Sequence, residues 1–188
     1  MTTLLNVTGL VAGYTRPVVG PVDFALEPGQ VLGLTGPNGS GKSTLLAALV
    51  NPARRFAGSV ATAPGIHLSL QTQRQPGVAG VPLCGRELLA LTGATAAGLP
   101  EWLAGRLEER LDHLSGGQLQ FLHLWACLQA PGEVVLLDEP TNNLDPEGVG
   151  ALEAAITARA GSGAGILLVS HDERFVAATC SRIVSLAP

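Results

Sequence analysis

A glycine-rich segment carries the residues with the most specific chemistry. Residues 36–44 satisfy the pattern GxxxxGK[S/T], in which consecutive backbone N–H groups and the start of the next helix bind phosphate oxygens. The lysine places a positive charge beside the β and γ phosphates, and the hydroxyl of the next residue can ligate Mg²⁺. The glycine spacing does not fit the dinucleotide pattern GxGxxG. The sequence therefore predicts a phosphate-binding loop formed by Gly36, Pro37, Asn38, Gly39, Ser40, Gly41, Lys42, Ser43 and Thr44.

Two adjacent carboxylates form the second group. The apolar run 134–137 ends abruptly at Asp138 and Glu139. Strand ends in open α/β sheets face the ligand crevice, so Asp138 is expected to hold Mg²⁺ through water. Glu139 is expected to orient or deprotonate an attacking water. The alternative is a pair of solvated acids in a turn.

The third group is a short glycine-containing segment, Leu114-Ser115-Gly116-Gly117-Gln118. Its serine hydroxyl and glycine N–H groups can face an anion at the start of a helix. Alone it is also an ordinary helix cap. Its position between the phosphate loop and the Asp138-Glu139 pair makes the functional interpretation more specific.

The elements that must position these groups alternate along the chain, which predicts an α/β protein. Two probable helices without a strand follow a Pro- and Gly-containing stretch, so we expect a helical subdomain inserted at approximately 76–130. The remaining chain should form one domain. The expected strands are 4–8, 22–26, 31–34, 66–70, 134–137, 166–169 and 183–186, and the expected helices are 43–50, 83–91, 101–111, 117–129, 147–159 and 173–179.

Composition narrows the class of partner. The 188 residues carry a net charge of −4, and Lys42 is the only lysine beside ten arginines. Such a chain lacks a broad positive field, so no nucleic-acid partner is expected. The three cysteines form no CxxC pair, so neither a disulfide framework nor a zinc site is expected. No apolar run reaches membrane-spanning length, and the chain is expected to be cytoplasmic unless a partner tethers it.

With its three groups in this order, the chain resembles the ATP-binding-cassette (ABC) ATPases over practically all of its length. The resemblance implies a P-loop NTPase core of mixed sheet flanked by helices, with an N-terminal antiparallel β portion and the inserted helical subdomain. It implies hydrolysis of ATP with Mg²⁺. It also implies that two cassettes, expected to be identical, pack head to tail. ATP held by Lys42 of one copy would then be covered by Ser115 and Gly117 of the other.

The same resemblance implies further site residues. Tyr14 matches the aromatic residue that stacks on adenine. Gln71 and Gln73 both follow a candidate strand, and either could be the glutamine that contacts Mg²⁺ and water, with Gln73 favoured. Asp145 matches the aspartate at the dimer seam, and His171 matches the histidine that contacts the γ-phosphate and stabilises transition-state charge.

The sequence also departs from the family pattern. Two arginines usual after the LSGGQ segment are absent, and Phe121 and Ala126 occur in that helix. Phe121 and Trp125 lie four residues apart, so an apolar contact is expected instead. Asn142 and Asn143 replace the commoner serine and small residue before Asp145.

Two functions follow from the resemblance. The first is the ATP-hydrolysing subunit of an ABC transporter, peripheral on the inner face of the membrane, which drives separate transmembrane permease subunits. The spacing of Gln73-Arg74 and Val81-Pro82 is weakly similar to that of zinc and manganese importers. The alternative is a soluble ABC ATPase acting on ribosomes, suggested by the segments 139–145 and 170–175. Such factors carry two cassettes and a charged linker, which this chain lacks.

Overall fold

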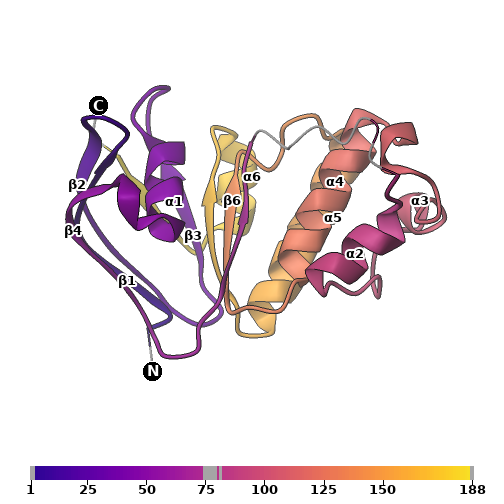
Figure 1. Ribbon diagram of the computed structural model, residues 1–188, viewed down its shortest axis with the longest axis horizontal. Coiled ribbons are helices and arrows are strands. Elements are labelled where there is room, and N and C mark those ends of the chain that lie inside the picture. Colours follow the sequence, from indigo (N-terminus) through magenta and orange to yellow (C-terminus); the bar gives the residue numbers. More distant parts are fainter. Residues whose placement is uncertain (1–2, 74–79, 81, 187–188) are drawn as a thin grey trace.

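The computed structural model describes residues 3–73, 80 and 82–186, and these residues form strands and helices in alternation (Figure 1). The strands are β1 (Leu5–Gly13), β2 (Pro17–Leu26), β3 (Val31–Thr35), β4 (Arg55–Thr62), β5 (Leu68–Gln71), β6 (Val134–Asp138), β7 (Gly165–Val169) and β8 (Arg182–Ser185). The helices are α1 (Lys42–Val50), α2 (Gly85–Thr92), α3 (Glu101–Ala104), α4 (Gly116–Gln129), α5 (Pro146–Gly161) and α6 (Glu173–Thr179), with short 3₁₀ turns at Pro52–Arg54 and Leu111–His113.

The strands form two sheets of different type. One is antiparallel, in the order β2-β1-β4, and the other is parallel, in the order β5-β6-β7-β3-β8. In Figure 1 the antiparallel sheet lies at the left and α1 lies between it and β3, while α4 and α5 lie on the other side of the parallel sheet. The predicted mixed α/β fold with an N-terminal antiparallel portion is therefore confirmed.

The parallel strands have the sequence that burial on both faces requires. All five residues of β6 and all five of β7 are buried, so these strands are continuous apolar runs rather than alternating ones. One apolar cluster joins the sheet to α1 and the antiparallel strands, and a second joins it to α4 and α5. Strands β6, β7 and β3 are neighbours in this sheet, and the pairing of Asp138 with Val169 brings the ends of β6 and β7 together.

Strands β1 and β2 extend beyond the predicted 4–8 and 22–26, and two further elements differ more strongly from the sequence prediction. Strand β4 was not expected, because six of its eight residues are exposed and it has no apolar run. Helix α3 ends at Ala104, whereas a helix over 101–111 was predicted. The segment after α3 uses its backbone elsewhere: Arg86 N donates to Leu107 O, and Leu111 N donates to Leu83 O, both at 2.9 Å. These backbone hydrogen bonds to the start of α2 take the place of the bonds that would continue the helix beyond Ala104.

The region from α2 to α4 covers most of the segment for which a helical insert was predicted. Between residues 82 and 133 the structure describes helices and turns, with one isolated bridge between Cys84 and Arg110 and no longer strand pairing. The predicted start of the insert at residue 76 lies outside the described residues. Phe121 and Trp125 stack with ring centroids 6.3 Å apart, which confirms the expected apolar contact.

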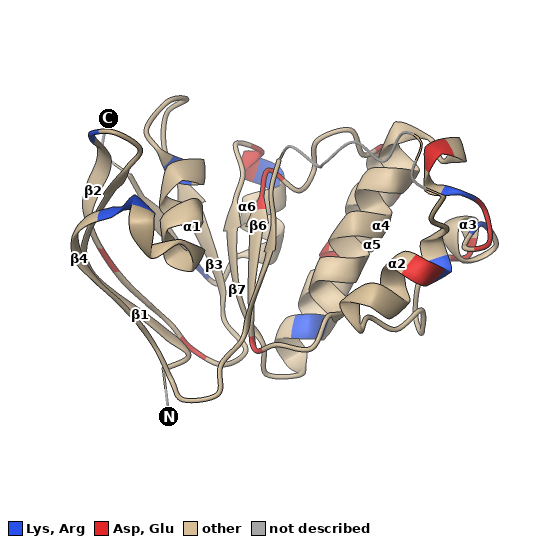
Figure 2. Cartoon of the chain, viewed as in Figure 1, with Lys and Arg blue, Asp and Glu red and all other residues tan. Residues whose placement is uncertain are grey.

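Charged residues of the insert pair with one another. In Figure 2 basic and acidic segments lie side by side around α2 and α3, where Arg86 pairs with Glu108 and Arg110 pairs with Asp112. Such exposed pairs contribute little stability. No helix among the described residues is long and apolar enough to cross a membrane.

Candidate nucleotide-binding site

The phosphate-binding loop joins β3 to α1 in a conformation that requires glycine. Gly39 and Gly41 have φ values of 85° and 87°, which side chains other than glycine rarely adopt. A Cβ added at Gly41 would lie 2.6 Å from the Cβ of Val19. Gly41 caps α1, so the loop leads directly into the positive end of the helix dipole. This arrangement suits a bound phosphate.

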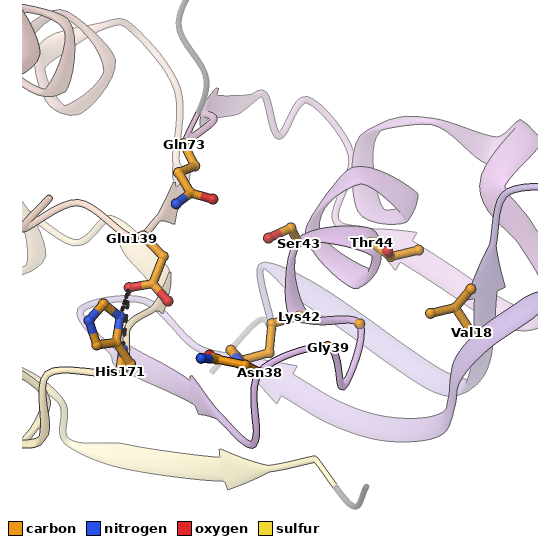
Figure 3. A pocket seen from close by; sticks show the side chains of 10 residues that line it. Val18, Asn38, Gly39, Lys42, Ser43, Thr44, Gln73, Glu139 and His171 are labelled. Atoms are coloured by element: carbon orange, nitrogen blue, oxygen red, sulfur yellow. Dashed lines mark hydrogen bonds and ion pairs between the residues drawn. The ribbon is translucent and has the colours of Figure 1, made fainter.

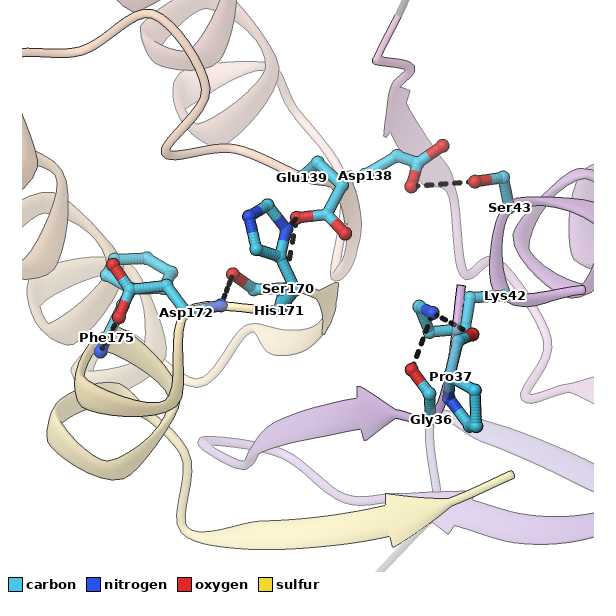
Figure 4. A network of polar contacts seen from close by, with 10 residues as sticks. All are labelled: Gly36, Pro37, Lys42, Ser43, Asp138, Glu139, Ser170, His171, Asp172 and Phe175. Atoms are coloured by element: carbon cyan, nitrogen blue, oxygen red, sulfur yellow. Dashed lines mark hydrogen bonds and ion pairs between the residues drawn. The ribbon is translucent and has the colours of Figure 1, made fainter. Parts of the chain in front are cut away.

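The side chain of Lys42 folds back over this loop. Its Nζ donates to the carbonyl oxygens of Gly36 and Pro37, both at 2.8 Å (Figure 4), and the residue is 7% exposed. An ammonium group has three donors. Two hold the loop and one remains for a phosphate oxygen.

A hydroxyl and a carboxylate meet between α1 and β6. Ser43 Oγ donates to Asp138 Oδ1 at 3.1 Å. Burial raises the pKa of Asp138 and repulsion from Glu139 adds to this, whereas hydrogen bonds from Ser43 and from the backbone of Gln73 oppose the shift. A divalent cation beside Asp138 would stabilise the ionised carboxylate and so oppose the rise in its pKa. The hydroxyl, carboxylate and neighbouring Gln73 amide are oxygen donors that Mg²⁺ accepts.

The carboxylate of Glu139 contacts His171. Glu139 has φ 50°, an unusual value for a residue other than glycine, and its N–H donates to Val169 O at 2.9 Å. Its Oε2 lies 2.8 Å from His171 Nδ1 and accepts a second bond from His171 N at 3.3 Å (Figure 4). The Glu139 side chain is 11% exposed and that of His171 is 64% exposed. A buried carboxylate is thus held by an accessible imidazole.

Glu139, His171 and most of the phosphate-binding loop line one cavity of about 510 Å³ (Figure 3). Glu139 and His171 face the loop of Lys42 across it, and Gln73 extends toward it from the segment after β5. Val18, which the sequence analysis did not indicate, is the one apolar side chain among the described residues of the wall, and it is 46% exposed. The wall is formed by Val18, Asn38, Gly39, Gly41, Lys42, Ser43, Thr44, Gln73, Glu139 and His171.

Six residues predicted for this site do not line the cavity. Three of them, Gly36, Pro37 and Asp138, instead bond to Lys42 or Ser43, which do line it. Gln71 is buried, and its amide nitrogen donates to Thr72 O at 2.9 Å. Ser40 lines a neighbouring cavity with Leu186. Tyr14 is 55% exposed in the turn after β1, with the guanidinium of Arg54 4.1 Å from its ring centroid.

The LSGGQ residues form a separate cavity of about 340 Å³. Ser115 and Gln118 cap α4 reciprocally, since Gln118 N donates to Ser115 Oγ at 3.2 Å and Ser115 N donates to Gln118 Oε1 at 3.0 Å. Asp145 caps α5 by accepting from Gly148 N at 2.8 Å. Gly116 does not line this cavity. Its wall is formed by Trp102, Ser115, Gly117, Gln118, Asn143, Leu144, Asp145, Glu147 and Gly148, none of which lines the first cavity.

The fold and the first cavity together define a P-loop ATPase with the three motifs of an ATP-binding cassette. A family model described as "ABC transporter" matches residues 19–82. The zinc import ATP-binding protein ZnuC of Paracoccus denitrificans is 37% identical over 181 residues, covering 93% of this chain and 71% of the relative. The chain therefore belongs to the family of ABC transporter ATP-binding proteins.

Other comparisons agree with this assignment. ZnuC of Cereibacter sphaeroides is 36% identical, with 90% of this chain and 72% of the relative covered. A structure described as the ATP-binding subunit of an ABC transporter superposes with a TM-score of 0.83 at 27% identity, covering 98% of this chain and 86% of that one. The chain is thus an ATP-binding, ATP-hydrolysing subunit of an ABC transporter, and it works with membrane permease subunits. None of these comparisons supports the ribosomal alternative.

Proposed function

We propose that two copies of this chain bind Mg-ATP head to tail and that its hydrolysis drives zinc import through separate permease subunits. The observation that carries the proposal is the division of the predicted nucleotide-binding groups between two cavities in one chain. The phosphate loop, Glu139 and His171 line one cavity, and Ser115 and Gly117 line the other. A second copy supplies the missing half of each site.

In and around the first cavity, each side chain has a distinct task. Lys42 binds the β and γ phosphates with its free N–H. Ser43, Asp138 and Gln73 are the residues that would hold Mg²⁺, which neutralises phosphate charge when bound. Glu139 accepts a proton from the attacking water, and His171 keeps that carboxylate oriented and donates toward the γ-phosphate. Tyr14 keeps one ring face for adenine while Arg54 covers the other.

From the second cavity, the partner copy would close over the nucleotide. The hydroxyl of Ser115 and the N–H groups of Gly116 and Gly117 are donors for the γ-phosphate. Gln118 holds the serine through the reciprocal cap. Asp145, which fixes the start of α5 in the same cavity, lies at the proposed seam and reports the state of one site to the other.

The cargo and location rest on the relatives. The ZnuC proteins are named for zinc import, and zinc is accordingly the substrate we propose for the complete transporter. The ATPase would lie on the cytoplasmic face of the membrane, bound to the permease. Zinc would pass through the permease and would not enter the nucleotide cavity.

Co-purification tests the partner and zinc uptake tests the cargo. Tagged protein is isolated from its native membranes in mild detergent, and bound proteins are identified by mass spectrometry. Recovery of a polytopic membrane protein is expected, and cells lacking the chain should regain zinc uptake with wild-type protein but not with Glu139→Gln. Ribosomal proteins without a membrane partner would refute the transporter assignment, and uptake of a different metal would refute zinc alone.

A further inference from the structure

A third cavity, of about 320 Å³, lies apart from both nucleotide cavities. Strand β5 forms one wall, and residues of α2 and α4 form the others. Its lining is mainly apolar, but it contains an amide, an imidazole and a thiol. The lining residues are Ser69, Leu70, Gln71, Leu88, Thr92, His123, Ala126, Cys127 and Ala130.

Two polar atoms in this cavity have no hydrogen-bond partner among the residues that the structure describes. Gln71 is 3% exposed, and although its amide nitrogen donates to Thr72 O, its Oε1 accepts no hydrogen bond. The Nε2 of His123 is also buried without a hydrogen bond. Buried polar groups are normally paired. Two unpaired atoms at one cavity therefore indicate a ligand that contacts both walls.

The thiol of Cys127 completes the group. His123 and Cys127 are four residues apart on α4, so their Cβ atoms lie about 5–6 Å apart on one face. Zinc bonds of about 2.0–2.1 Å to nitrogen and about 2.3 Å to sulfur allow one ion to join such a pair. Burial lowers the pKa of His123, which keeps the imidazole neutral, and burial raises the pKa of Cys127 to about 12.

We propose that His123 Nε2, Cys127 Sγ and Gln71 Oε1 bind one divalent metal ion of the zinc type, with water as the fourth ligand. Imidazole and thiolate favour such an ion over Mg²⁺. As the sulfur–metal bond forms, the thiol proton passes to water. The described residues contain no cluster of three or more His, Cys, Asp or Glu suited to a metal, so the amide of Gln71 serves as the third protein ligand.

The site would join the two parts of the chain that carry the nucleotide groups. Helix α4 begins at Gly116 beside Ser115, and β5 ends two residues before Gln73. A bound ion would tie this helix to this strand from outside the ATP site. The proposed site does not depend on which substrate the transporter carries. It would let a metal ion inside the cell act on the ATPase.

Cobalt(II) is the probe, because a cobalt–thiolate bond gives a near-ultraviolet charge-transfer band that an all-oxygen magnesium site cannot produce. The purified chain is titrated with Co²⁺ in excess Mg²⁺ without nucleotide. We expect the band to saturate at one ion per chain and to disappear on addition of Zn²⁺. Cys127→Ser should abolish it, and His123→Leu and Gln71→Leu should each weaken cobalt binding at least several-fold.

The other two cysteines provide the control. The double variant Cys84→Ser/Cys180→Ser should keep the full band, and ATP binding by each variant verifies that it is folded. Absence of a band in the wild-type chain would overturn the proposal. A band that survives Cys127→Ser, or that is indifferent to His123→Leu in a protein that still binds ATP, would do so as well.

Discussion

The Nδ1 atom of His171 lies 2.8 Å from Oε2 of Glu139, across the ends of the adjacent parallel strands β6 and β7. The backbone of Glu139 contributes to this contact, because its φ of 50° turns the residue out of the strand while its N–H stays bonded to Val169 O. The turn at Glu139 thus directs its carboxylate to His171. Replacing Glu139 and replacing His171 should therefore affect ATP hydrolysis in different ways.

Glu139→Gln should reduce ATP hydrolysis by about 10²–10⁴-fold, because the amide cannot accept the water proton. ATP binding should persist, since Lys42 and Ser43 are untouched, and the ATP-bound chain should accumulate as a dimer. Phosphate release and light scattering measure the two effects. A variant that stays monomeric with ATP would contradict closure between two identical copies.

His171→Ala should lower hydrolysis by about 10²-fold, as removal of one donor to developing transition-state charge does elsewhere. The affinity for ATP should change little, so single-turnover kinetics must separate binding from chemistry. His113→Ala is the matched control, because the His113 side chain is 66% exposed and lines none of the cavities described above. Equal effects of both substitutions would remove the proposed role of His171.

Asp138 should make the nucleotide-free protein less stable as pH rises. Its pKa is raised in the folded state, chiefly by burial, above its ordinary value of 3.8. At pH values between the ordinary pKa and the raised pKa of the folded state, the folded chain binds more protons than the unfolded one. The free energy of unfolding therefore falls as pH rises. Asp138→Asn should remove this decline in urea unfolding without Mg²⁺.

Asp112 provides a control of opposite sign. A hydrogen bond from Arg110 lowers the pKa of Asp112. Its contribution to the free energy of unfolding is therefore fully present above the ordinary aspartate pKa, and it is lost as pH falls through the lowered pKa. Asp112→Asn should therefore weaken stability only on the neutral side. The same response from both variants would show that the burial of Asp138 has no effect on stability.

Tyr14→Ala should weaken ATP binding about tenfold, because stacking of a base on an aromatic ring is worth about 1–3 kcal/mol. Tyr14→Phe should retain the affinity. Arg54→Met tests whether the guanidinium on the other ring face holds the tyrosine in place, and it should have a smaller effect. Fluorescent ATP analogues measure all three, and full affinity in Tyr14→Ala would exclude the stacking role.

Arg55→Met should destabilise the fold by about 1–3 kcal/mol. The Arg55 guanidinium donates to Ala48 O at 2.7 Å and to Leu49 O at 2.9 Å, the free carbonyls at the end of α1, which has no basic residue in its last turn. Arg182→Met, on an exposed residue of β8, is the control. Urea midpoints that agree for the two variants would refute the capping role.

The sequence by itself determined the fold class and most of the first cavity. GxxxxGK[S/T] and a buried strand ending in two acids are local patterns, and each needs only its own strand, turn or helix to be recognised. The buried strands were also apparent, because burial on both faces makes β6 and β7 continuous apolar runs. Strand β4 and the early end of α3 were not predicted. Strand β4 depends on its pairing with β1, and the segment after α3 bonds to the start of α2.

Tertiary structure decided which side chains meet. Gln71 and Gln73 differ by two residues and are equivalent as sequence, yet Gln73 lines the nucleotide cavity and Gln71 lines the third one. His123 and Cys127 gave no signal in the sequence, because they lie outside the three motifs and the cysteines form no CxxC pair. Their third ligand lies 52 residues before His123, and only the packing of α4 beside β5 brings it within reach.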